Sequence, residues 1–234
     1  MKKKYLIIVA HPDDETLGCG ALIHHLRSKN NKVKVVVLGE GSSCRYKKLN
    51  LENIKKINFA IEQRKKYCLK ALKILKVKDV SFYNLKCGRF DVTPIIDIAS
   101  IIESEIKIFK PQIILTHSIN DIHIDHQVSY KATLQATRPG TDNKVEKLLS
   151  FEILSSSEKN FENVFSPNYY FEISKKNLKA KIDALKCYKT EVAKHPFSRS
   201  LLSVKSLAAL RGAQSGNYFA EAFKIVRSIQ KNKQ

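Results

Sequence analysis

The chain has no tryptophan, one methionine and only five cysteines among its 234 residues. The cysteines are odd in number, widely spaced and free of any C-x-x-C pair: Cys19, Cys44, Cys68, Cys87 and Cys187. This pattern argues against a disulfide framework and against a cysteine-based zinc finger. Long apolar runs are also missing, since none approaches the roughly 18 residues of a transmembrane helix. We therefore expect no membrane-spanning segment.

Acidic residues are scarce, with 22 Asp and Glu against 42 Lys and Arg, and the formal net charge is +20. Lysine supplies most of the excess, which is not concentrated in one tail and has no nucleic-acid recognition motif beside it. We interpret it as a solvated lysine surface and expect no nucleic-acid partner. An anionic small substrate, such as a phosphate-bearing one, fits the charge, although charge alone does not show it.

We do not expect the N-terminal segment to be a secretory leader. Three lysines precede an apolar run, but that run covers only residues 5–10 and then meets His11 and three acidic side chains. A secretory apolar region is longer and ends in a small-residue cleavage site. The segment instead predicts a first β-strand in a cytoplasmic protein.

Short apolar runs alternate with amphipathic segments over the first two thirds of the chain. The pattern predicts four strands, at residues 4–10, 32–38, 80–85 and 111–117. It predicts four helices, at residues 16–28, 53–77, 94–109 and 125–137. Such alternation is typical of an α/β fold, here a Rossmann-like, mostly parallel sheet with helices on both faces.

The last third predicts strands at 149–154 and 169–173 and helices at 178–192 and 218–229. No repeat, low-complexity tract or long linker interrupts the chain. We therefore predict a single domain over residues 1–234. Residues 1–145 would form its α/β core, and residues 146–234 would form a C-terminal extension of added strands and helices.

The segment His11-Pro12-Asp13-Asp14-Glu15 directly follows the first predicted strand and precedes a helix. Ligands of an open α/β sheet gather beyond the carboxyl ends of its strands, so a functional site is expected here. A plain turn could use an aspartate to cap the helix. That explanation leaves His11, at the end of a buried strand, unaccounted for.

A second polar cluster, residues 116–127, also follows a predicted strand and precedes a helix. It contains three of the seven histidines of the chain, His117, His123 and His126. The first and fourth strands of a doubly wound sheet can be neighbours. The two clusters would then supply the mixed nitrogen and oxygen ligands typical of catalytic zinc, although iron, cobalt or nickel could fill the same site.

The motif of residues 11–15, followed by His123-x-Asp125-His126, resembles the LmbE-like, or PIG-L, family of zinc-dependent N-deacetylases. Four further segments resemble bacterial members that act on amino-sugar derivatives, so the resemblance covers nearly the whole chain. These segments are residues 38–43, 151–158, 167–169 and the stretch from Arg211-Gly212 to Glu221-Ala222-Phe223.

The resemblance implies a role for each matching residue. His11, Asp14 and His126 match the zinc ligands of the family, and Asp13 matches its general base. His123 matches a histidine that stabilises the transition state or protonates the leaving amine. Asp125 matches a carboxylate that supports the histidine pair.

Substrate contacts are predicted from three further residues. Arg64 matches an arginine in the long second helix of the family. Arg45 lies in the loop after the second strand and can donate two hydrogen bonds to a phosphate or sugar, and His117 ends the fourth strand. The chain departs from the family at Tyr67, where many members have an acidic residue, and at Lys86-Cys87-Gly88-Arg89, where many have Pro-Asp-Gly-Arg. These departures concern substrate recognition more than the chemistry.

Together these patterns predict a zinc-dependent hydrolase that removes the N-acetyl group from an N-acetylglucosamine-type amino sugar or its conjugate. A thiol-conjugate amidase and a metal-dependent phosphoesterase are alternatives, because a metal site alone does not separate an amide from a phosphate ester. An inert basic module that binds glycan or nucleic acid is a third. Free, nucleotide-linked, lipid-linked and glycosidic sugars all stay open as substrates, as does a homo-oligomer.

Overall fold

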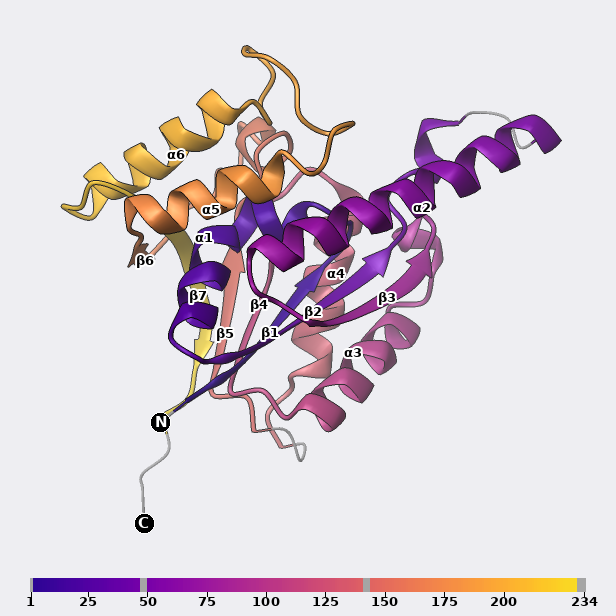
Figure 1. Cartoon of the computed structure of the whole chain (residues 1–234). Helices are drawn as coiled ribbons and strands as arrows, with labels where there is room; N and C mark the ends of the chain where they lie inside the picture. The colour runs from indigo at the N-terminus through magenta and orange to yellow at the C-terminus, as the bar shows by residue number, and fades with distance from the viewer. Residues whose placement is uncertain (1, 47–49, 141–143, 231–234) are drawn as a thin grey trace.

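The computed structural model describes residues 2–46, 50–140 and 144–230 of the chain. Its described strands form a seven-stranded sheet in the order β3-β2-β1-β4-β5-β7-β6 (Figure 1). The strands are β1 (Lys4–Val9), β2 (Lys32–Gly39), β3 (Asp79–Leu85), β4 (Ile113–His117), β5 (Lys147–Phe151), β6 (Tyr169–Glu172) and β7 (Ala220–Ser228). The pairs from β3 to β5 are parallel, and β7 is antiparallel to both of its neighbours. The predicted mostly parallel sheet is thus confirmed.

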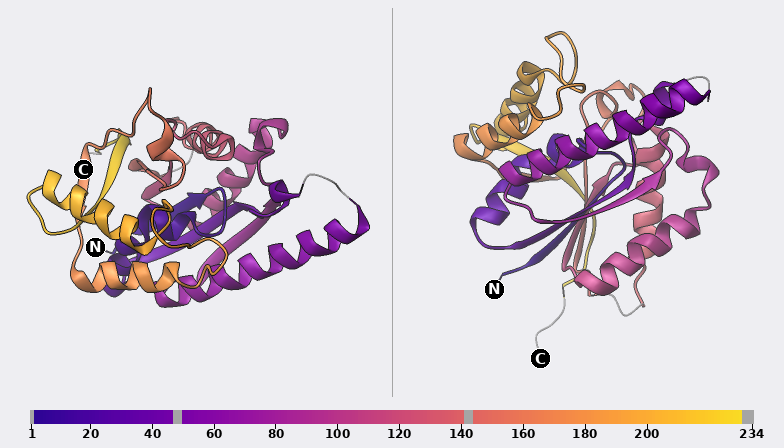
Figure 2. Two further views of the ribbon diagram at one scale, coloured as in Figure 1. Left: turned by 90° about the horizontal axis from the view of Figure 1, so that it is seen from above. Right: turned by 45° about the vertical axis from the view of Figure 1, so that its right-hand side comes forward.

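Helices cover both faces of this sheet (Figures 1 and 2). They are α1 (Asp14–Ser28), α2 (Leu51–Ile74), α3 (Ile95–Phe109), α4 (Ile124–Ala136), α5 (Lys175–Leu185) and α6 (Leu201–Gln214). One apolar core joins the sheet to α1, α2, α5 and α6, and a second joins it to α3 and α4. The predicted Rossmann-like layering is therefore confirmed.

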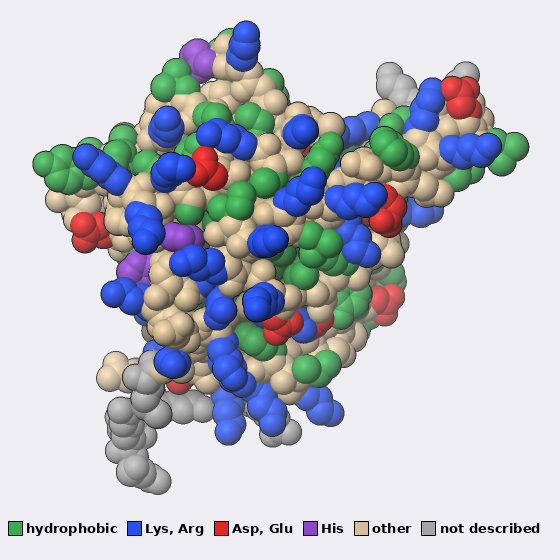
Figure 3. All heavy atoms as spheres, viewed as in Figure 1, with side chains coloured by type: hydrophobic (Ala, Val, Ile, Leu, Met, Phe, Trp, Pro, Cys, Tyr) green, Lys and Arg blue, Asp and Glu red, His purple; other side chains and the backbone are tan. Residues whose placement is uncertain are grey.

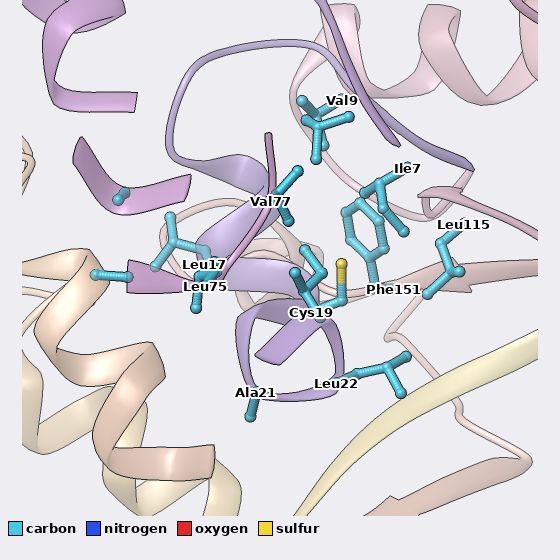
Figure 4. Packing of buried hydrophobic residues seen from close by; sticks show 14 of the residues in the cluster. Ile7, Val9, Leu17, Cys19, Ala21, Leu22, Leu75, Val77, Leu115 and Phe151 are labelled. Atoms are coloured by element: carbon cyan, nitrogen blue, oxygen red, sulfur yellow. The ribbon is translucent and has the colours of Figure 1, made fainter. Parts of the chain in front are cut away.

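The central strand β1 explains why the N-terminal apolar run is continuous rather than alternating. Ile7 and Val9 lie in the core beneath α1 and α2, whereas Leu6 and Ile8 lie in the core beneath α3 and α4. All four are fully buried, as expected of a parallel strand covered on both faces. Figure 4 shows Ile7 in the first core, close to Cys19 of α1 and Phe151 of β5.

Gly18 brings α1 close to the sheet. A Cβ atom at this position would lie 2.4 Å from Cδ2 of the buried Phe151 ring. Overpacking a core usually costs about 1–3 kcal/mol, and alanine gains ~1 kcal/mol over glycine in a helix. We therefore expect Gly18→Ala to destabilise the fold by up to about 2 kcal/mol. Urea unfolding measures the difference.

Gly20→Ala is the matched control, because its Cβ would lie 3.3 Å from Lys181 Cγ, whereas the Cβ at position 18 would lie 2.4 Å from the Phe151 ring. Its loss of stability should be clearly smaller than that of Gly18→Ala. Equal unfolding free energies for the two variants would show that the close approach of α1 to Phe151 does not matter.

The C-terminal third corrects several sequence predictions. Residues 218–229 were predicted as a helix, but Ala220–Ser228 forms β7, which fills the place between β5 and β6. Helix α6 lies in a region to which the sequence assigned no element. The predicted helix at 178–192 begins and ends earlier, as α5 at Lys175–Leu185. The segment predicted as an extension thus continues the same sheet.

The surface agrees with the interpretation of the charge. Figure 3 shows Lys and Arg side chains spread over most of the visible face rather than gathered in one patch. Among the described residues, no helix has the length and apolar character needed to cross a membrane.

Candidate metal centre and active site

The two polar clusters meet where the sequence placed them, at the carboxyl ends of β1 and β4. These strands are hydrogen-bonded neighbours, with Tyr5 opposite Ile113 and Ile7 opposite Leu115. The residues that follow them, including His11, Asp14 and His126, therefore lie at one edge of the sheet. This is the topological switch point, where α/β proteins bind their ligands.

His11, Asp14 and His126 form a buried triad. Asp14 Oδ2 lies 3.5 Å from His11 Nδ1 and 3.4 Å from His126 Nε2. A tetrahedral zinc ion with bonds of 2.0–2.1 Å needs donor atoms about 3.4 Å apart. The exposed fractions of the three residues are 6%, 1% and 1%. The donor atoms thus have the spacing and the burial of a three-ligand zinc centre.

Carboxylates hold both histidines of the triad from behind. His11 Nε2 lies 2.8 Å from Asp125 Oδ2, and His126 Nδ1 lies 3.1 Å from Asp121 Oδ2. Such partners fix the orientation and tautomer of metal-binding histidines and raise their basicity. Asp121 is held in turn by the hydroxyls of Ser156 and Ser157, which donate at 2.8 and 2.6 Å.

The charges and unpaired atoms of the triad indicate a cation. Asp14 Oδ1 is buried without a hydrogen-bond partner among the described residues. Burial raises the pKa of Asp14, but His126 and His117 outweigh it and hold the pKa well below its usual value. Burial lowers the pKa of His126, yet Asp14 and Asp121 raise it to about 10. The carboxylates thus draw positive charge to this point, and a divalent ion would supply it.

A second set of donor atoms lies next to the first. His11, Cys87 and Asp125 each offer a donor atom, and these atoms lie within 4.8 Å of one another. However, Asp125 is already engaged, because it accepts hydrogen bonds from the Gly88 and Phe90 amides at 2.6 and 3.0 Å. Its Oδ2 also contacts His11 Nε2 at 2.8 Å. The first triad is therefore the better metal centre.

Asp13 is buried directly before Asp14 in the chain but is not part of the triad. Its φ of 114° is a rare backbone conformation for a side-chain-bearing residue, and Glu15 Oε2 accepts a hydrogen bond of 3.0 Å from its amide. The Asp13 carboxylate instead meets Arg64 at 3.1 Å and Arg199 at 2.8 Å. Burial raises the pKa of Asp13 despite these two arginines. A raised carboxylate pKa next to a metal centre suits a general base.

His123 lies against the triad and caps the next helix. Its ring stacks on His126 at 4.6 Å between centroids and meets the His11 ring at 5.0 Å. Its Nδ1 accepts a hydrogen bond of 3.2 Å from the Asp125 amide at the start of α4. Burial, together with His126 and His11, lowers the pKa of His123 to about 4. The neutral ring therefore carries its proton on Nε2, a hydrogen-bond donor.

The three predicted substrate contacts lie in different surroundings. The Arg45 side chain is 47% exposed and pairs with Glu191 at 2.8 Å. Arg64 is buried and donates to the carbonyls of Gly41 and Pro12. His117 is fully buried behind His126, and its Nε2 accepts a hydrogen bond of 2.9 Å from the Ala10 amide. Of these three residues, only Arg45 is placed to contact a ligand that arrives from solvent. Arg64 and His117 stay predicted substrate contacts, and their burial argues against that role.

Sequence reasoning missed Arg199, Glu191 and the role of Asp121. Arg199 comes from the C-terminal third and donates to Asp13 and to Ser155, at 2.8 and 2.7 Å. Glu191 is buried beside Arg64 and Arg45, at 3.7 and 2.8 Å. No local motif surrounds these two residues. Asp121 could have been found, because it lies within the second polar cluster.

Solved structures share this fold from end to end. The N,N′-diacetylchitobiose deacetylase of Pyrococcus horikoshii superposes with a TM-score of 0.75 at 17% identity, over 96% of this chain and 84% of that one. The 4-carboxy-2-hydroxymuconate hydratase GalB of Pseudomonas putida KT2440 superposes with a TM-score of 0.73 at 19% identity, over 100% of both chains. At such low identity these likenesses establish the fold but not the reaction.

Sequence comparison is more specific. The uncharacterized deacetylase YaiS of Escherichia coli (strain K12) is 27% identical over 194 residues, which is 81% of this chain and 92% of that protein. The profile of the PIG-L family, described as GlcNAc-PI de-N-acetylase, matches residues 6–137. That match spans more than half of the chain and includes both polar clusters. The chain therefore belongs to the PIG-L family of de-N-acetylases.

Proposed function

We propose that this protein is a zinc-dependent hydrolase that removes the N-acetyl group from an N-acetylglucosamine-type amino sugar or its conjugate. The observation that carries the proposal is the divergence of two adjacent carboxylates. Asp14 belongs to the triad with two histidines, whereas Asp13 lies outside the triad and has a raised pKa. A metal-assisted hydrolase needs both, one carboxylate as ligand and one as base.

The donor set favours zinc, with His11, Asp14 and His126 as the proposed ligands. Two imidazoles and one carboxylate leave a position for water or substrate, as in other catalytic zinc sites. A bound ion would polarise the amide carbonyl and lower the pKa of a coordinated water. Iron, cobalt or nickel would satisfy the same donors.

The side chains around the triad would carry the proton transfers. Asp13 takes the proton of the attacking water and returns it to the amide nitrogen as the C–N bond breaks, and Arg64 and Arg199 hold its carboxylate in place. His123, neutral with its proton on Nε2, donates a hydrogen bond to the oxyanion that develops on the carbonyl oxygen. Asp125 fixes the orientation of His11 from behind. The products would be acetate and a free amine.

Arg45 is the proposed substrate contact at the rim, since its side chain is half-exposed and its guanidinium can bind a sugar hydroxyl or a phosphate. The N,N′-diacetylchitobiose deacetylase among the structural neighbours supports an amino-sugar substrate, and the deacetylase name of YaiS supports the reaction. A phosphate-bearing substrate, a cytoplasmic location and a homo-oligomer stay predictions of the sequence.

The test is amine release from free, glycosidic, nucleotide-linked and lipid-linked N-acetylglucosamine, with added zinc and with a chelator. We expect release from one of these classes, lost on chelation and restored by zinc, because without the ion neither the amide carbonyl nor the attacking water is activated. Acetate should appear in equal amount.

The same assay separates the alternative activities. Release of amine from a thiol conjugate alone would favour the conjugate amidase, and release of inorganic phosphate would favour the phosphoesterase. Amine release that is insensitive to chelation, in protein shown to be free of metal, would contradict the proposed role of the triad.

A further inference from the structure

Two cysteines far apart in the sequence meet beside the candidate metal centre. Cys44 lies in the short 3₁₀ helix Ser43–Arg45 after β2, and Cys87 lies in the turn after β3. Their Sγ atoms are 2.8 Å apart, across 43 residues of chain. Cys44 is exposed to solvent, whereas Cys87 is buried. The pair therefore has one member that a soluble reagent can reach and one that is sheltered.

The side chain of Glu40 holds the two segments together without the sulfurs. Glu40 accepts hydrogen bonds from the amides of Ser42 and Ser43 on one segment, at 2.6 and 3.0 Å. It accepts a third, of 2.8 Å, from the amide of Cys87 on the other segment. Since a disulfide needs its sulfurs at 2.03–2.05 Å, the thiols can join after a movement smaller than 1 Å, roughly. Such proximity favours a bond between them over a bond to another molecule.

The turn that contains Cys87 also supports the metal centre. The Gly88 and Phe90 amides donate to the two oxygens of Asp125, and Asp125 meets His11 Nε2 at 2.8 Å. On the other segment, Arg45 follows Cys44 directly and reaches Glu191. A bond between the sulfurs would therefore shift both the turn that holds Asp125 behind His11 and the segment that contains Arg45.

We propose that Cys44 and Cys87 form a reversible disulfide that lowers the activity of the adjacent site when the protein meets a hydroperoxide. The effect on activity rests on the proposed function, but the formation of the disulfide does not.

Hydrogen peroxide is the two-electron oxidant of the two thiols. The exposed Cys44 thiol loses its proton, and the thiolate attacks one peroxide oxygen. The O–O bond breaks to give a sulfenic acid and a hydroxide, which takes up that proton and becomes the first water. The sulfur of Cys87 then attacks the sulfur of Cys44, and the hydroxyl leaves with a proton as the second water. Both thiols are oxidised and the peroxide is reduced. A dithiol such as dithiothreitol reverses the bond by exchange.

The experiment uses the metal-loaded, fully reduced protein, treated with one equivalent of hydrogen peroxide. We expect an intact mass lower by two hydrogens and, in a non-reducing digest, a peptide pair joined through Cys44 and Cys87. Amine release, measured as kcat/KM, should fall about tenfold. This is the lower end of the effect of losing a residue that orients a metal ligand. Dithiothreitol should restore both the mass and the activity.

Cys44→Ser and Cys87→Ser should each lose the mass change and the sensitivity to peroxide. Cys187→Ser is the matched control: Cys187 is a half-buried thiol outside the pair, so this variant should behave as the wild-type protein does.

Absence of the joined peptides, or joining through Cys187, would overturn the proposal. A complete disulfide with unchanged kcat/KM would overturn its regulatory part. If no substrate releases amine even from reduced protein, the proposed function has failed, and the mass and the peptides still decide whether the disulfide forms.

Discussion

Asp13→Asn is expected to lower kcat by about 10²–10⁴-fold, the usual contribution of a general base, while the metal stays bound. Asparagine keeps the size of the side chain and can still meet Arg64 and Arg199, but it cannot take a proton from water. The three proposed metal ligands are untouched. Steady-state amine release gives kcat, and elemental analysis of the purified variant gives its metal content.

The matched control is Asp91→Asn, a change of the same chemistry at an exposed position outside the site. Its kcat should equal that of the wild-type protein. If Asp13→Asn kept its fold but lost the metal, Asp13 would be a ligand and the assignment of the two carboxylates would be reversed. A variant with undiminished kcat would remove Asp13 from the mechanism.

The core of the fold was predictable because its signals are local. Strand β1 is buried on both faces, so its apolar run is continuous, and β2 and β4 show similar runs. The helices between them show apolar positions at helical spacing. Sequence neighbours are enough to recognise both patterns.

The C-terminal third was mispredicted because pairing decides its structure. Residues 218–229 contain Ala, Glu and Lys, which favour a helix locally. In the fold, this segment lies between β5 and β6, and its backbone bonds to both of these strands. Such pairing overrides a weak intrinsic preference. The residues near Ala220–Ser228 in the sequence include neither β5 nor β6.

The site shows the same division between local and distant information. His11, Asp13 and Asp14 share one motif, and His123, Asp125 and His126 share another, so spacing and resemblance both pointed to them. Arg199 reaches Asp13 across 186 residues. The contact between Arg199 and Asp13 depends on how the segment before α6 folds back over the edge of the sheet. The residues next to Arg199 in the sequence do not predict this path of the chain.

The second large effect is expected at the metal centre itself. His126→Ala removes a proposed ligand and leaves Asp14 and Asp121 buried without their shared imidazole. We expect zinc affinity to fall by more than about 100-fold, beyond the 10–100-fold typical of losing a supporting partner, and amine release to fall to background. Competition with a chromophoric chelator measures the affinity, and circular dichroism checks the fold.

Asp121→Asn supplies the graded comparison that makes this test decisive. Asp121 contacts His126 Nδ1 and not the site of the ion, so its loss should weaken zinc binding by about 10–100-fold, less than the loss of His126. His25→Asn is the control, because His25 packs against Phe171 away from the triad and should leave the affinity unchanged. If the zinc affinity of folded His126→Ala matched that of the His25 variant, the ion would lie elsewhere. The order His126→Ala, then Asp121→Asn, then His25→Asn is the one that a metal centre built on His11, Asp14 and His126 requires. The three changes remove a ligand, the partner of a ligand and a residue outside the site.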